Sequence, residues 1–197
     1  MRKLEIALVC ALAICVFSAA KQIPFSLACE DIRSDTLRLH IVANSDSDPD
    51  QAVKLLVRDA VLKESEAFST SADKAQAEEK LSRSLEEIEQ TANRTLSKNG
   101  FAYTAKAKIC EMYFDERKYE NVTLPAGNYT ALRIELGEAK GKNWWCVIYP
   151  SVCLSAATEE KLSGYSETEK EVVSEPNKYE VRFKIEEWIQ KLSQGRP

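Results

Sequence analysis

The hydrophobic period of this sequence changes once along the chain, and this change limits the folds that the chain can adopt. Between residues 72 and 98 apolar residues recur every three or four positions, which predicts a long amphipathic helix ended by Asn99-Gly100. After it the pattern becomes extended: residues 101–114 and 129–136 alternate, and residues 144–150 form a third run rich in strand-forming side chains. Such a sequence is typical of an α/β (α+β) domain in which helices cover one face of a sheet.

A further strand and helix precede this pattern. Residues 37–43 alternate like a half-buried strand, and a helical period follows an acidic loop. Asp48 suits the N-cap of that helix, Pro49 suits its first position, and Gln51 completes a capping-box-like spacing. The predicted order is therefore β-α-α-β-β-β, a two-layer sandwich with both helices on one face of a mixed sheet.

The acidic loop also allows a metal-site interpretation. Asp46, Asp48 and Asp50 alternate as in the opening of a calcium-binding loop. The sixth position of that loop requires glycine and is Gln51 here, and its twelfth requires a bidentate glutamate and is Val57. We therefore predict no metal and no cofactor. A secreted calcium-dependent hydrolase or an envelope structural module that uses this loop remains the alternative function.

The N-terminus carries the features of an export signal. Arg2 and Lys3 precede an apolar run from Ile6 to Ala20, which ends in small residues. This run is short for a membrane span of ~20 residues. Residues 1–20 are consistent with either a cleaved secretory signal or a retained anchor that contacts the membrane.

The rest of the chain divides by composition. Residues 21–36 are predicted to be a linker and residues 37–155 a globular domain. Residues 156–178 form a polar acidic linker, and residues 179–197 a docked strand followed by an amphipathic helix.

No catalytic constellation is apparent in the sequence. His40 is the only histidine, so a histidine-based triad or metal site must include it, and it lies within a strand pattern beside Arg38. No phosphate-binding loop and no nucleophile or zinc-protease motif occurs. The net charge of −4 argues against a nucleic-acid partner. We predict that the protein is not an enzyme.

The segment around Trp144 and Trp145 is the strongest candidate for a partner contact. Adjacent residues on a strand point to opposite faces of the sheet, so one ring must be covered by another layer, by the tail or by a partner. Cys146 and Cys153 flank Pro150, and a turn there brings them within disulfide distance. We predict this bond, with Cys110 left as a buried free thiol.

The chain resembles the stage II sporulation protein R family of endospore-forming bacteria. The resemblance lies in "LRLHIVANSDSDPDQAVKLLVRDAV", in "LPAGNYTALRIELGEAKGKNWWCVIYPSVC" and in "VRFKIEEWI" near the C-terminus. It implies a signalling protein exported from the forespore into the space between the forespore and mother-cell membranes. There it would activate a membrane-embedded aspartic protease that processes the precursor of sigma factor E. The expected partner-binding residues are Asn44, Asp46, Lys142, Asn143, Trp144 and Trp145.

Overall fold

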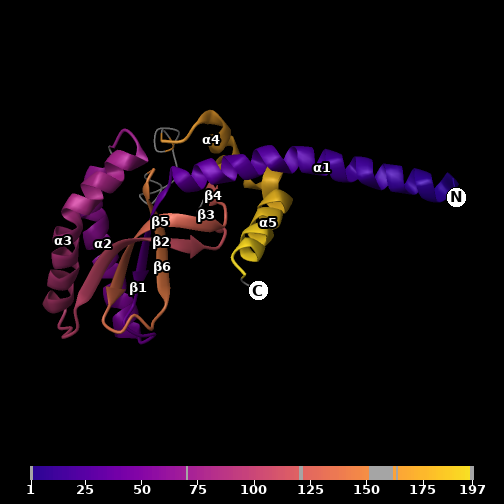
Figure 1. Cartoon of the computed structure of the whole chain (residues 1–197). Helices are drawn as coiled ribbons and strands as arrows, with labels where there is room; N and C mark the ends of the chain where they lie inside the picture. The colour runs from indigo at the N-terminus through magenta and orange to yellow at the C-terminus, as the bar shows by residue number, and fades with distance from the viewer. Residues whose placement is uncertain (1, 70, 120–121, 151–161, 163, 196–197) are drawn as a thin grey trace.

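The domain is built on a mixed four-stranded sheet in the order β2-β5-β1-β6 (Figure 1). The computed structural model describes residues 2–69, 71–119, 122–150, 162 and 164–195. The strands are β1 (Leu37–Val42), β2 (Ala105–Phe114), β5 (Gly127–Leu136) and β6 (Asn143–Tyr149). β1 runs parallel to β5 and antiparallel to β6, and β2 runs antiparallel to β5. The predicted element order and mixed sheet are confirmed.

Two helices cover one face of this sheet. They are α2 (Asp48–Ser69) and α3 (Lys74–Lys98), and α3 ends at Asn99-Gly100 as predicted. Between helices and sheet lies an aliphatic core in which Leu39, Ile134 and Leu81 are fully buried. The sheet supplies alternate residues to this core, as the extended period of the sequence predicts.

The opposite face of the sheet is partly covered by a short hairpin that forms a separate two-stranded sheet. Its strands are β3 (Arg117–Tyr119) and β4 (Val122–Leu124). These strands are not predictable from the sequence, because a three-residue strand is too short to show a period. Beneath the hairpin, Arg38 is fully buried among the rings of Phe114, Tyr119 and Tyr129. All six residues of β1 are therefore buried, whereas the sequence predicts a half-buried strand.

The first helix, α1 (Arg2–Ser34), corrects the predicted linker at residues 21–36. Its C-terminal half carries apolar residues on one side, and Phe25, Cys29 and Ile32 are buried there. The N-terminal half extends away from the domain with its apolar side chains exposed. α1 is long and apolar enough to cross a bilayer, and a signal sequence near an N-terminus meets the same criteria.

Two C-terminal helices pack beside α1. α4 (Glu167–Ser174) begins in the segment predicted to be a solvated linker, and Ser166 and Glu169 form a capping box at its start. Val172 and Val173 of α4 are buried against α1. The part of the predicted linker at residues 156–161 lies outside the described residues.

Residues 179–185 were predicted to be a strand and instead belong to α5 (Pro176–Ser193). Tyr179 and Phe183 are four residues apart, so in a helix they share one side, where both contact Phe25 of α1. The strand prediction from the alternation of these residues was therefore wrong, because their contacts require the spacing of a helix. The predicted amphipathic helix is present within the same element.

Candidate partner-binding surface

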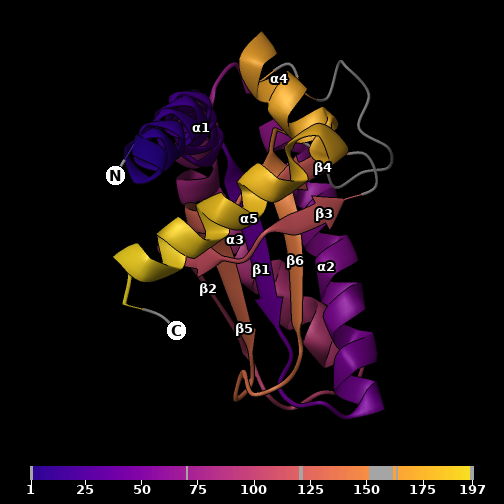
Figure 2. The same cartoon turned by 90° about the vertical axis from the view of Figure 1, so that its right-hand side faces the viewer.

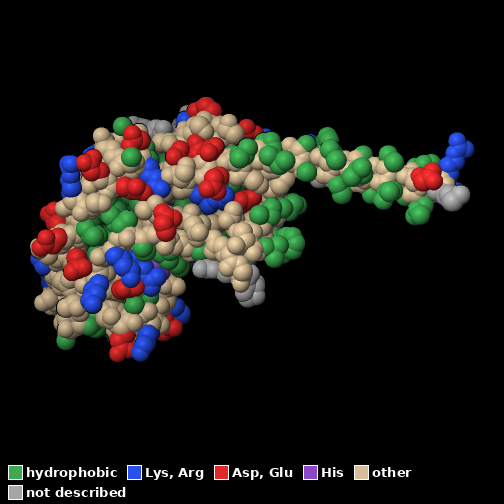
Figure 3. Space-filling view, viewed as in Figure 1, with side chains coloured by type: hydrophobic (Ala, Val, Ile, Leu, Met, Phe, Trp, Pro, Cys, Tyr) green, Lys and Arg blue, Asp and Glu red, His purple; other side chains and the backbone are tan. Residues whose placement is uncertain are grey.

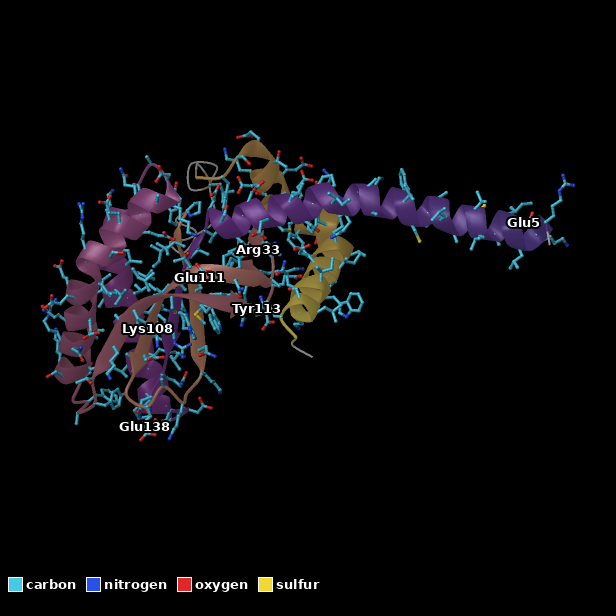
Figure 4. The ribbon with its side chains drawn as sticks, viewed as in Figure 1. Glu5, Arg33, Lys108, Glu111, Tyr113 and Glu138 are labelled. Carbon is cyan, nitrogen blue, oxygen red and sulfur yellow. The ribbon has the colours of Figure 1, made fainter. Side chains whose placement is uncertain are left out.

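Two loops that are distant in sequence form one structure at the end of the sheet farthest from α1. The loop after β1 and the turn between β5 and β6 are joined through backbone hydrogen bonds. The Gly141 amide donates to the Ala43 carbonyl at 2.9 Å, and the Lys140 amide donates to the Asn44 carbonyl at 3.2 Å. Figure 4 labels Glu138 at this end, and its amide donates to Asn44 Oδ1 at 2.9 Å.

Glycine is required where the two loops touch. A Cβ on Gly141 would lie 2.2 Å from the Ser45 carbonyl oxygen. Gly137 adopts a φ of +56°, and a Cβ there would lie 2.2 Å from Asn44 Oδ1. The loop and the turn therefore form a single surface, which we call the loop pair (residues 43–47 and 137–143).

Asp46 and Asp50 hold the loop pair together through hydrogen bonds. Asp46 accepts a hydrogen bond from the Lys142 amide at 2.7 Å. Asp50 accepts from Asn44 Nδ2 at 2.9 Å and from Ser45 Oγ and the Tyr103 hydroxyl at 2.5 Å. Among the residues that the structure describes, no three His, Cys, Asp or Glu side chains are grouped to hold a metal ion.

These hydrogen bonds also determine the charge of the loop. Burial alone would raise the pKa of Asp50, but hydrogen bonds from Ser45, Tyr103 and Asn44 outweigh it and lower that pKa. Burial, followed by the bond to Asp50, raises the pKa of Tyr103. Asp50 is thus an ionised acceptor and Tyr103 a neutral donor at neutral pH.

The predicted cap of α2 is displaced by one residue. Ser47, not Asp48, is the N-cap: its hydroxyl accepts from the Asp50 amide at 3.4 Å and its carbonyl accepts from the Gln51 amide at 3.0 Å. Pro49 is consequently the second residue of the helix. The Gln51 side chain donates to the Ser45 carbonyl at 2.8 Å instead of returning to Asp48.

Lys54 holds α2 to the loop pair, a role that the sequence does not predict. Although lysine is usually exposed, this residue is only 5% exposed. Its ammonium group donates to Gln51 Oε1 at 2.7 Å and to the Lys142 carbonyl at 2.9 Å. Burial lowers the pKa of Lys54. No sequence signal predicts this role, because one of its acceptors is a backbone carbonyl from a distant turn.

The two tryptophans point to opposite sides of the sheet, as predicted, and both are half-buried. Trp144 packs at the edge of the aliphatic core, with the Arg58 guanidinium 5.0 Å from its ring. Trp145 stacks on His40 with centroids 3.8 Å apart and contacts the edge of Phe114 at 4.9 Å. They therefore do not form one continuous patch. Asn44, Asp46, Lys142 and Asn143 do lie together.

His40 is buried within the sheet and is hydrogen-bonded through its Nε2 atom. Its Nε2 lies 2.8 Å from Asn143 Oδ1, which makes Nε2 the protonated nitrogen of a neutral ring. Burial, with a smaller contribution from Arg133, lowers the pKa of His40 to about 4 even though the bond to Asn143 opposes this shift. With only 3% of its surface exposed, His40 holds Asn143 and Trp145 in place.

Charged side chains extend the surface along the open face of the sheet. Arg133 and Lys108 both pair with Glu135, at 2.7 and 3.2 Å. Burial would raise the pKa of Glu135, but these two cations lower it. A pocket of about 820 Å³ lies between these side chains and the loop pair, lined in part by Asn44, Tyr103 and Lys106. Figure 3 shows Lys and Arg gathered beside acidic residues on this lower half of the body.

Cys146 is disulfide-bonded, is 3% exposed and faces the aliphatic core. Its predicted partner, Cys153, lies outside the described residues, so the pairing itself remains a prediction. Cys110 is a free thiol on β2 and is half-buried.

The fold is a mixed α/β domain with a polar, hydrogen-bonded surface at one end of its sheet and, at the other end, an apolar helix that meets the criteria of a membrane span or a signal sequence. The stage II sporulation protein R family model matches residues 33–159. Stage II sporulation protein R of Bacillus subtilis (strain 168) is 33% identical over 185 residues, covering 82% of this chain and 83% of that protein. The chain belongs to the stage II sporulation protein R family. No solved structure matches it significantly.

The family match covers the sheet, α2, α3 and both halves of the loop pair. Most of α1 and all of α4 and α5 lie outside it. The family match supports a role in sporulation for this chain, and the candidate surface lies within the matched residues.

Proposed function

We propose that this chain is an exported sporulation signal that activates a membrane-embedded aspartic protease through the loop pair. Activation would trigger processing of the precursor of the mother-cell sigma factor E. The chain would act in the space between forespore and mother cell, secreted or held by its N-terminal helix. This function requires a contact surface and export, and no chemistry by the chain itself.

The observation that carries the proposal is the loop pair itself. Two of the sequence segments that resemble the family meet there, and backbone hydrogen bonds fix their relative position. A surface fixed in this way presents exposed groups without losing much conformational entropy on binding. Asp46, Glu138, Lys140 and Lys142 are exposed on it.

Lys142 provides a clean test of this surface. Its backbone amide and carbonyl make the structural hydrogen bonds, whereas its side chain is exposed. Replacing the side chain therefore changes the surface charge without removing the bonds that hold the loops. The chain would be co-expressed with the protease and the sigma precursor in a non-sporulating host, and the processed sigma factor would be measured by immunoblot.

We expect Lys142→Glu to reduce processing strongly at unchanged melting temperature. Arg83→Glu is the matched control, because Arg83 is an exposed cation in the middle of α3 and its ion pair with Glu79 is also exposed. His40→Gln tests the absence of chemistry, because a glutamine amide can still donate to Asn143 but cannot act as a general base, so processing should stay within a few-fold of the wild type. Full processing with folded Lys142→Glu would contradict the proposed surface, and no processing by the wild type would contradict the function.

A further inference from the structure

The outer side of α5 carries a row of apolar side chains that nothing in the described structure covers. Val181, Ile185, Trp188 and Leu192 are 72%, 41%, 65% and 58% exposed, and Ile189 beside them is 41% exposed. Their spacing of four, three and four residues places them along one side of the helix. This side lies opposite the one on which Phe183 and Glu186 are buried against the body. Such a row marks an interaction surface.

The inner side of α5 is held firmly, so its outer side has a fixed direction. Phe183 contacts the edge of Phe25, with ring centroids 5.1 Å apart. Glu186, almost fully buried, accepts from Arg33 at 3.1 Å and from Ser26 at 2.7 Å. Arg33 also donates to the Ala126 carbonyl at 3.0 Å, which joins α1, α5 and the turn before β5.

The outer row faces the direction in which α1 leaves the domain. Figure 2 looks along α1 from its N-terminal end and shows α5 lying across the near face of the molecule, transverse to α1. Figure 3 shows hydrophobic side chains on the edge of α5 that faces the projecting half of α1. A plane drawn across α1 just beyond α5 would therefore contact this row.

The projecting half of α1 has the length of a bilayer core. Its exposed apolar residues run from Leu4 to Ile23, and a helix of that length spans about 30 Å. Lys21 lies near the inner end of this stretch, where a long cationic side chain can reach the lipid headgroups. A bilayer crossed by this half of α1 would therefore have its surface at the plane that contacts α5.

We propose that α5 is a membrane-surface helix, whose outer row docks on the same bilayer in which α1 is anchored. Trp188 lies in this row, and tryptophan is the side chain enriched at bilayer interfaces. Lys184 and Lys191 flank the row on one side and Lys178 and Arg182 on the other, so cationic side chains border it on both sides. The three lysines also pair with carboxylates, among them Glu187 and Glu171. The two helices would hold the loop pair at the far end of the domain, directed away from the lipid. This inference does not depend on the identity of the protease or on activation.

The test uses the full chain reconstituted in phosphatidylethanolamine and phosphatidylglycerol vesicles. Cys10 and Cys15 are exposed free thiols on the projecting half of α1, so their protection from an impermeant maleimide reports insertion. The Trp188 fluorescence is isolated as the difference between the wild type and Trp188→Phe. We expect this difference signal to be quenched by lipids brominated near the headgroup and less by lipids brominated deep in the chain.

Two substitutions make the test specific. Ile185→Glu, within the outer row, should remove most of the quenching. Leu56→Glu changes a comparably exposed leucine of α2 outside the row and should leave the quenching unchanged. Trp188 that is not quenched in vesicles, or is shielded only when a membrane protein partner is present, would overturn the proposal. Labelling of Cys10 and Cys15 in intact vesicles would overturn it as well, because α1 would not then be inserted.

Discussion

The two faces of the sheet bury the same strands by different means. On the side of α2 and α3, β1 contributes Leu37, Leu39 and Ile41 to a core of aliphatic side chains. On the other side the same strand contributes Arg38 and His40, which are equally buried but lie among aromatic rings. The packing of the first face is stabilised by the volume and shape of its side chains. The packing of the second face is stabilised by the charge states and stacking of a few polar groups.

This difference has a consequence for function. The second face is continuous with the charged pocket and with Asn143 of the loop pair. Polar residues buried on that face therefore hold the candidate surface, whereas the aliphatic face only stabilises the domain. Substitutions on the two faces should consequently have different signatures in stability, pH dependence and signalling.

The largest expected effect comes from the aliphatic face. Leu132 is fully buried beneath the helices, and Leu132→Ala removes contacts and leaves a cavity, which should cost about 2–5 kcal/mol of unfolding free energy. Met112 on the other face is only half-buried, so Met112→Ala should cost less. Urea unfolding of both variants measures the contrast. Equal losses would show that the two faces are packed with the same tightness.

The second effect belongs to the polar face and depends on pH. The pKa of His40 is about 4 in the folded protein and about 6.5 when exposed, so the unfolded state binds the proton more tightly. The stability that neutral His40 supports is complete above pH 6.5 and is lost as the pH falls towards 4. A shift of this size corresponds to about 3 kcal/mol.

The measurement compares urea unfolding at pH 7.5 and 4.5 for the wild type and His40→Gln. Carboxylates that titrate in the same range affect both proteins, so the difference between them isolates His40. We expect His40→Gln to lose distinctly less stability in acid. Equal losses in the two proteins would mean that His40 is not held neutral by burial.

A third effect tests how the end of β6 is fixed. A bond from Cys146 to Cys153 should contribute about 2–3 kcal/mol, which Cys146→Ser would remove. Alkylation of the exported, oxidised protein followed by mass analysis tests the bond directly. Cys110 is the internal reference, since a half-buried free thiol should react. Free alkylation of both Cys146 and Cys153 would disprove the bond.

The sequence predicts the aliphatic face better than the polar one, for a physical reason. Periodicity reports which side of an element is apolar, so the β-α-α-β-β-β order and the helix-facing residues of β1 were correctly predicted. Arg38 and His40 occupy the alternate positions that normally face solvent. Their burial depends on β3, β4 and Trp145, which meet them only in the folded structure.

In the candidate surface, too, the sequence identifies some residues and not others. The polar residues of the loop pair were identified because Asn, Asp and Gly gather in its two sequence segments. Lys54 and Tyr103 were missed because their partners are a distant carbonyl and a carboxylate fifty residues away. The helical state of residues 179–185 was missed for a similar reason, since the contact with Phe25 decides it.

The smallest predicted effect concerns the start of α2, the helix that joins the aliphatic face to the loop pair. Ser47→Ala removes the side chain that accepts the Asp50 amide and should cost about 0.5–2 kcal/mol. Asp48 is exposed in the first turn, where its charge is stabilised by the helix dipole, so Asp48→Ala should cost about 0.3–1 kcal/mol. Asp73→Ala removes the corresponding cap of α3, whose carboxylate accepts the Gln76 amide at 2.8 Å, and calibrates the measurement. In urea unfolding, Ser47→Ala and Asp73→Ala should lose similar amounts of unfolding free energy, and Asp48→Ala should lose less. A larger loss for Asp48→Ala than for Ser47→Ala would show that Asp48 is the N-cap.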